Sequence, residues 1–256
     1  AVYKGGAIYS VGAYSNVCNS NFTENEAEYD GGAIYWQGVT NTPSKFNTVD
    51  GCTFSRNVAY AKAASSGNTE GGGAVFWSTG GENGKVLNSN FYNNSVQTDG
   101  KSDGGAILWD KSSHIFIDGC LFDGNYVTTT DTGSGTWVQG GVMYARPAEN
   151  LTITNSVFQN CWSKREAGAL YLQNGGTVGI HLINNTFINN TAYGNKVTND
   201  NDLGGGAVLV KSASGSFTMI NSTFINNTSN YGGGIVFHSV NGGTITMTNA
   251  TFDGNK

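Results

Sequence analysis

Two short motifs alternate along the whole chain, and this repeat constrains the fold more than any other feature. The first is Gly-Gly-Ala or a close variant, and its third residue is Ala7, Ala33, Ala74, Ala106, Val142, Ala169, Ala207 or Ile235. The second is Phe-x-x-Asn, and its Phe is Phe22, Phe54, Phe91, Phe122, Phe158, Phe187, Phe224 or Phe252. Self-similarity of this kind is typical of a solenoid, in which each repeat packs against its neighbours.

The spacing between the two motifs separates a constant half of the repeat from a variable half. From the first motif to the Phe it is 15 to 18 residues, with one value of 21. From the Phe to the next first motif it is 11, 15 or 20. The sequence therefore predicts that insertions enter the solenoid at one corner.

The constant half shows columns of like residues when the repeats are aligned on the Phe. Five positions before the Phe the residue is always apolar: Val17, Val49, Val86, Ile117, Ile153, Leu182, Met219 and Met247. Three positions before it the residue is Asn or Gly, which predicts a left-handed bend between two short strands. Three positions after it seven residues are Asn and one is Cys161. This column predicts a ladder of hydrogen-bonded side-chain amides.

These columns predict an all-β fold, a single-stranded parallel β-helix of about eight turns. Each turn should hold about three short strands, and strand spacing places successive turns about 4.8 Å apart. We expect residues 1–256 to form a single β-helix domain. Because the first residues already lie within a repeat, we interpret it as a fragment of a larger surface protein.

The alternating motifs resemble a known repeat family. Gly31-Gly32-Ala33-Ile34 together with Phe22-x-x-Asn25, and their copies, are similar to the repeats of the polymorphic outer-membrane proteins of chlamydiae. The same pair occurs in adhesin-like surface proteins of methanogenic archaea. The resemblance covers all eight repeats and implies a right-handed β-helix at the cell surface that serves attachment. Cys161 for Asn, Ala167 for Gly and Ile235 for Ala depart from the pattern.

Composition excludes several partners and favours an extracellular location. The net charge of −5 argues against nucleic acid, and no apolar stretch is long enough to span a membrane. Charged residues make up only 12% of the chain, about half the usual share. We expect a monomer at the cell surface that carries no cofactor.

The four cysteines are predicted to be free and mostly buried. Cys52 and Cys120 share a column but lie two turns apart, which is too far for a disulfide. Cys18 and Cys161 are four turns apart. Free thiols suit an anaerobic organism, such as a methanogen.

The sequence contains no clear catalytic or metal site. A carbohydrate-active β-helix would need acids in one column on adjacent turns. Asp30, Asp103 and Glu166 precede Gly-Gly-Ala elements but never on consecutive turns, and we interpret them as solvated turn residues. The three histidines fall in different columns. The stretch 199–204 has alternating oxygen ligands but fits turn residues better than a calcium loop.

The column two residues after the anchor of the first motif is the candidate binding site. It reads Tyr9, Tyr35, Phe76, Leu108, Tyr144, Tyr171, Leu209 and Phe237. The residue before it in each repeat is aliphatic and should face the core, so alternation turns this column outward. We expect Tyr9, Tyr35, Phe76, Tyr144 and Tyr171 to contact a sugar or a partner protein, unless insertions fold over them. Trp36, Trp77 and Trp109 form the next column and should face the core.

The sequence allows three functions. The first is a non-catalytic adhesin module that binds a glycan or protein on another cell. The second is a polysaccharide-active enzyme, a lyase or hydrolase, and the third is a passive stalk. The absence of an acidic cluster disfavours the enzyme, and variable insertions favour the adhesin over the stalk.

Overall fold

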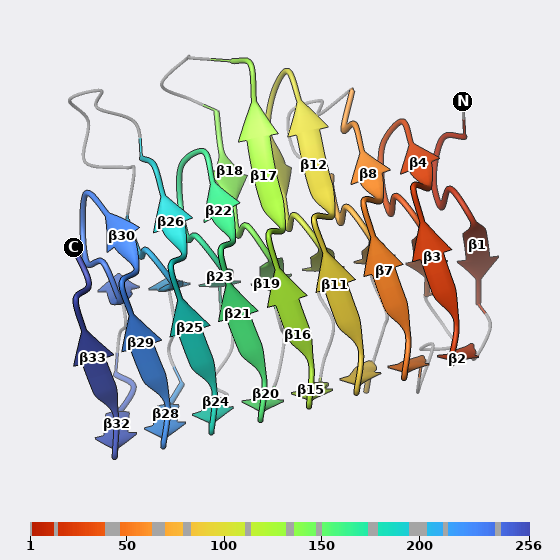
Figure 1. Ribbon diagram of the computed structural model, residues 1–256. Coiled ribbons are helices and arrows are strands. Elements are labelled where there is room, and N and C mark those ends of the chain that lie inside the picture. The colour runs from red at the N-terminus through yellow and green to blue at the C-terminus, as the bar shows by residue number, and fades with distance from the viewer. Residues whose placement is uncertain are drawn as a thin grey trace.

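The computed structural model describes residues 2–12, 15–38, 47–62, 70–78, 83–110, 114–131, 136–146, 150–173, 179–194, 204–211, 215–238 and 242–256. All regular structure in these ranges is β-strand, arranged in four long parallel sheets and one short pair. In the four long sheets, each strand between the two ends pairs with its counterparts from the turn before and the turn after (Figure 1). The predicted parallel β-helix of about eight turns is therefore confirmed.

The first sheet contains the strand that follows each Gly-Gly-Ala element. Its strands are β1 Ile8–Val11, β5 Ile34–Gln37, β9 Val75–Trp77, β14 Ile107–Asp110, β19 Met143–Arg146, β23 Leu170–Gln173, β27 Val208–Lys211 and β31 Ile235–His238. The second sheet contains the apolar column before the Phe. Its strands are β2 Asn16–Cys18, β6 Thr48–Asp50, β10 Lys85–Leu87, β15 Ile115–Asp118, β20 Leu151–Thr154, β24 Ile180–Ile183, β28 Phe217–Ile220 and β32 Ile245–Thr248.

The third sheet carries the Phe at the centre of each strand. Its strands are β3 Asn21–Thr23, β7 Thr53–Ser55, β11 Asn90–Tyr92, β16 Leu121–Asp123, β21 Val157–Gln159, β25 Thr186–Ile188, β29 Thr223–Ile225 and β33 Thr251–Asp253. Figure 1 shows these strands side by side along the length of the molecule, with the first and last turns at opposite ends.

A fourth sheet follows the Asn column, and the prediction of three strands per turn missed it. Its strands are β4 Glu26–Ala27, β8 Val58–Ala59, β12 Ser95–Thr98, β17 Tyr126–Thr129, β22 Trp162–Ser163, β26 Thr191–Ala192 and β30 Thr228–Ser229. The short strands β13 Ser102–Asp103 and β18 Val138–Gln139 form an additional pair beside it. Several fourth-sheet strands have only two residues, so they carry no alternating apolar pattern.

The main core lies inside the coil and is built from stacked columns. Neighbouring Phe rings from Phe22 to Phe252 stack with centroids 4.6–4.9 Å apart. Trp36, Trp77 and Trp109 are buried in the same cluster, as predicted, with centroid distances of 4.7 and 4.2 Å. Offset stacking of this kind adds to the stabilisation that burial provides.

The predicted left-handed bends and the amide ladder are both confirmed. All eight residues three positions before the Phe have φ between 46° and 63°: Asn19, Gly51, Asn88, Gly119, Asn155, Asn184, Asn221 and Asn249. In the ladder, the Asn57 Oδ1 accepts hydrogen bonds from the backbone N–H and the Nδ2 of Asn25. The Asn94 Oδ1 accepts the equivalent pair from Asn57. The column thus satisfies backbone groups that would otherwise be buried without partners.

The register of the eighth turn differs from the prediction by one residue. Val208 pairs with Ile235 and Leu209 with Val236, so Gly234 takes the place of the small Ala in the repeat. Phe237 therefore belongs to the inward column of Trp36 and not to the outward aromatic column. Three consecutive glycines, 232–234, made the sequence alignment ambiguous here.

Connections of variable length lie at two corners of the coil. The links from the fourth sheet to the first include the long segments 60–74 and 193–207, in the half where insertions were predicted. The link between β5 and β6 spans 38–47, so length also varies between the first and second sheets. The corners at the left-handed bends keep a constant length.

Candidate functional site

The predicted aromatic column faces away from the main core but is mostly covered. Tyr35, Phe76, Tyr144 and Tyr171 are at most 4% exposed and form a second cluster with Leu108 and Leu209. Tyr9 alone is open, at 56% exposure. The outward direction is thus confirmed, whereas an open stripe along all five residues is not present. The alternative, in which other parts of the chain cover the column, agrees with the burial of these four rings.

The rings of this column also stack on one another. Centroid distances are 5.3 Å for Tyr9–Tyr35, 5.1 Å for Tyr35–Phe76 and 5.2 Å for Tyr144–Tyr171, with nearly parallel planes. A sugar binds an aromatic side chain by packing on the ring face. In a stack the inner faces are already occupied, which is a second reason why the column makes a poor binding surface.

The acidic residues before the Gly-Gly-Ala elements are not solvated, which corrects the sequence interpretation. Asp30 is 2% exposed and Glu166 is 4% exposed. Lys4 Nζ lies 2.8 Å from Asp30 Oδ2, and the Gly71 N–H donates to Asp30 Oδ1. Burial raises the pKa of the Asp30 carboxyl, and the nearby Lys4 opposes this shift.

Asp103 lies on the same column, two turns before Glu166 and one before Gln139. Its Oδ1 is buried without a hydrogen-bond partner among the described residues. Desolvation, followed by the negative charge of Glu166, raises the pKa of this carboxyl well above its usual range. The two acids remain separated by one turn, so the predicted absence of acids on consecutive turns holds for them.

A small pocket opens at Glu166, where the connection before β19 returns to the first sheet. It is lined by Thr136, Trp137, Val138, Gln139, Arg165, Glu166 and Lys211. Its volume of about 20 Å³ is room for roughly one water molecule. A sugar ring cannot enter it, so a ligand here would lie on the surface and place one polar group in the pocket.

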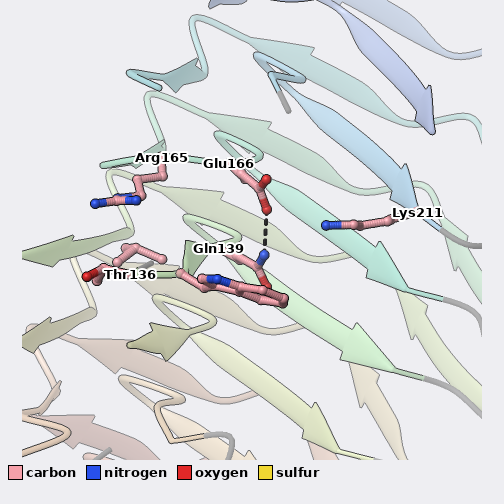
Figure 2. A pocket seen from close by; sticks show the side chains of 7 residues that line it. Thr136, Gln139, Arg165, Glu166 and Lys211 are labelled. Carbon is pink, nitrogen blue, oxygen red and sulfur yellow. Dashed lines mark hydrogen bonds between the residues drawn. The ribbon is translucent and has the colours of Figure 1, made fainter. Parts of the chain in front are cut away.

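Hydrogen bonding and charge fix the polar side of the pocket. Gln139 Nε2 donates to Glu166 Oε2, and both side chains are almost fully buried (Figure 2). Figure 2 shows the Lys211 side chain directed toward these two groups from the first sheet. Arg165, 3% exposed, lines the pocket from the fourth-sheet side. The pocket therefore offers both hydrogen-bond donors and a carboxylate acceptor.

Trp137 supplies the apolar side of the pocket and is 54% exposed. Lys101 Nζ and Lys211 Nζ lie 5.5 and 5.4 Å from the ring centroid. Among the described residues, no other aromatic ring stacks on it. An exposed indole beside a polar pocket can hold a sugar ring by face packing while the pocket binds a hydroxyl group.

The outer face of the fourth sheet bears a second group of aromatic residues, two of them half-buried. Tyr126 and Trp162 stack with centroids 4.6 Å apart, and Tyr193 meets Trp162 edge-on at 5.7 Å. Tyr193 is 58% exposed. Tyr126 and Trp162 thus cover one face of each other's ring.

The sequence analysis missed Trp137 and this outer row for related reasons. Trp137 lies in a connection without a repeat register. Tyr126 and Trp162 both stand four residues after the motif Phe. Alignment of that position would have shown two aromatic residues on consecutive turns.

The cysteines agree with the sequence prediction. All four cysteines are free, as predicted, and Cys18 is exposed while the other three are buried. Burial raises the pKa values of the Cys120 and Cys161 thiols to about 12.

Within the described ranges no three His, Cys, Asp or Glu side chains are grouped to hold a metal ion. The candidate stretch 199–204 lies outside the described residues, except for Gly204.

Comparison with known proteins identifies the class. A family model described as the right-handed β-helix region matches residues 6–204. The chain therefore belongs to the right-handed β-helix family. No curated protein and no solved structure matches the chain. In the part of the chain that the structure describes, no helix is long and apolar enough to cross a membrane.

Proposed function

We propose that the chain is a non-catalytic, cell-surface adhesin module that binds a glycan of another cell at Trp137 and the adjoining pocket. The observation that carries this proposal is the exposed, unstacked indole of Trp137 beside the buried polar pair Gln139 and Glu166. Carbohydrate sites commonly combine an aromatic face with a few fixed polar groups. The repeat resemblance to chlamydial and archaeal surface proteins supports the surface location and the role in attachment.

The shallow pocket supports recognition more than catalysis. A hydrolase or lyase needs its acid and base around a bound substrate. Glu166 lines the pocket, but Asp103 is not among its lining residues. The two acids lie on either side of Gln139, and the pocket holds only one of them.

Glycan binding by matched tryptophan variants tests the proposal. Wild-type protein, Trp137→Ala and Trp162→Ala are applied to an array of plant, microbial and animal oligosaccharides. We expect wild-type binding to be lost in Trp137→Ala and retained in Trp162→Ala, because the Trp162 ring is stacked on Tyr126. Equal binding by wild type and Trp137→Ala would disprove the proposed site. A wild-type protein that binds no glycan would favour the passive stalk.

An enzyme on the same fold is the second candidate, and the Asp103 carboxyl favours it. A carboxyl group with a raised pKa can act as a general acid near neutral pH. The test incubates the protein with pectic and other polysaccharides and measures new reducing ends and unsaturated products. If the wild-type protein forms product and both Asp103→Asn and Glu166→Gln do not, the chain is an enzyme and the adhesin proposal is wrong.

A further inference from the structure

Two lysines from distant parts of the chain meet at the same exposed indole. Lys101 Nζ and Lys211 Nζ lie 5.5 and 5.4 Å from the centre of the Trp137 ring. The fold brings Lys101 there because the Ser102 N–H donates to the Trp137 carbonyl oxygen. Lys211 ends β27 and also lies 5.9 Å from the centre of the buried Tyr171 ring. Both ammonium groups therefore lie over the indole, where an anionic ligand that reaches Trp137 meets them.

Two lysine ammonium groups at the pocket lie nearer the surface than the Glu166 carboxylate. Two carboxylates near it are engaged by neighbouring side chains: Glu166 accepts from Gln139, and Asp131 accepts from the Thr136 hydroxyl. A third, Asp103, lies one turn from Gln139 with its Oδ1 buried. Glu166 is 4% exposed, whereas Lys101 lies at the surface and Lys211 is partly exposed. A ligand that approaches Trp137 from solvent thus meets cations before it meets the Glu166 carboxylate. This local excess stands out in a chain of net charge −5.

We propose that the sugar bound at Trp137 is acidic, with a carboxylate or sulfate group that pairs with Lys101 and Lys211. This inference rests on the proposed glycan-binding function and specifies its ligand class. The anionic substituent pairs with the two ammonium groups and draws them off the indole, the sugar ring packs on the ring face that they leave, and one hydroxyl group reaches Gln139 and Glu166. Such contacts at the rim of a site select among ligands and depend on salt.

The experiment measures binding of three hexasaccharides by calorimetry, at low and high salt. Oligogalacturonate carries carboxylates, a chondroitin sulfate oligomer carries sulfates as well, and cellohexaose is neutral. The variants are Trp137→Ala, the double variant Lys101→Gln/Lys211→Gln, and the control Lys62→Gln/Lys85→Gln. The control removes two exposed lysines outside the pocket. Circular dichroism and thermal unfolding confirm that each variant is folded.

We expect at least one acidic hexasaccharide to bind more tightly than cellohexaose, and its affinity to fall as salt rises. Because exposed ion pairs are weak, Lys101→Gln/Lys211→Gln should lower that affinity roughly three- to tenfold, while Lys62→Gln/Lys85→Gln binds like wild type. Comparison of the two acidic probes identifies the anion. If cellohexaose binds as tightly, or the Lys101/Lys211 variant is unaffected, the acidic-sugar inference is wrong while glycan binding stands. If Trp137→Ala binds like wild type, the site itself is wrong.

Discussion

At the scale of single residues, the Asn ladder shows how one side chain serves several backbone groups. Asn94 Nδ2 donates to the Phe54 carbonyl oxygen and to Asn125 Oδ1, while its own Oδ1 accepts from the turn before. Each buried amide thus satisfies groups on three turns. A buried backbone N–H or C=O without a partner costs about 1 to 3 kcal/mol. The Asn column avoids this cost by supplying partners at a buried corner.

The one interruption of the ladder provides a stability test. Cys161 replaces Asn, so the Asn125 Nδ2 keeps its bond to the Phe91 carbonyl oxygen but meets a sulfur, at 3.9 Å, in place of an amide oxygen. Cys161→Asn should restore an oxygen acceptor for Asn125 and replace the weak Cys161 Sγ donor to the Phe122 carbonyl oxygen, at 3.6 Å, by an amide N–H. We expect the free energy of unfolding to rise by about 1 to 2 kcal/mol, measured by urea denaturation. A fall in stability would mean that the site cannot accommodate the amide. The control is Asn184→Gly at one of the left-handed bends, where the side chain makes only exposed hydrogen bonds to Asn155 and Asn221. It should change stability by less than about 1 kcal/mol.

Thiol reactivity tests the assignment of the cysteines. The thiolate is the reactive species, and burial disfavours it at Cys52, Cys120 and Cys161 by raising the pKa of each thiol. Ellman's reagent at about pH 8 should therefore modify Cys18 alone in the folded protein. All four thiols should react after denaturation. Rapid reaction of a second thiol under native conditions would contradict the buried columns.

At the scale of elements, the two glycines of the first motif have different roles. The first adopts a positive φ, as at Gly104 with 67°. The second has no room for a side chain, because a Cβ at Gly105 would lie 2.1 Å from the Gly141 carbonyl oxygen. The pair therefore sets both the turn into the first sheet and the close stacking of successive turns.

A glycine substitution tests this packing. Gly105→Ala forces neighbouring backbone atoms apart and should lower the free energy of unfolding by more than about 4 kcal/mol. Gly242→Ala is the control, since a Cβ there meets no atom within 4 Å and only its φ of 75° is unfavourable. The control should cost about 1 kcal/mol. Thermal unfolding of both variants gives the comparison, and equal effects would refute the packing role.

Sequence reasoning recovered the elements whose residues carry a strong column signal. The Phe column and the Asn and Gly bends predicted the second and third sheets because each position admits few residue types. The fourth sheet was missed because its inward positions hold small residues, such as Ala59, Ser163 and Ala192. The alignment of the eighth turn was wrong by one residue because Gly234 stands where other repeats have Ala, and the three glycines 232–234 still fit the motif.

At the scale of the whole molecule, the candidate site depends on contacts that the repeat does not encode. Trp137, Lys101 and Lys211 belong to three different turns and meet through a connection of variable length. Aligned columns treat each repeat alike, so they cannot place such a connection. The predicted stripe and the actual pocket are nevertheless adjacent, because Lys211 lies near both Tyr171 and Trp137.

The buried carboxyl of Asp103 makes the stability of the coil depend on pH. Its pKa is raised in the folded protein, so folding favours the protonated form. The stabilisation is full below the unfolded pKa of about 3.9 and is lost as pH rises through the folded pKa. Asp103→Asn should therefore stabilise the protein at pH 7 by about 1 to 3 kcal/mol and have less effect at pH 4. Urea denaturation at both pH values measures this, and an equal effect at both would contradict it.

We propose that this β-helix recognises a glycan at Trp137 without chemically changing it. The most direct measurement is a calorimetric titration of the wild-type protein and Trp137→Ala with oligosaccharides identified on the array, followed by mass analysis of the sugars recovered. We predict binding by the wild type, at least tenfold weaker binding by Trp137→Ala, and unchanged sugars in both samples. Unchanged affinity in Trp137→Ala, or cleaved sugar recovered from the wild type, would contradict the account.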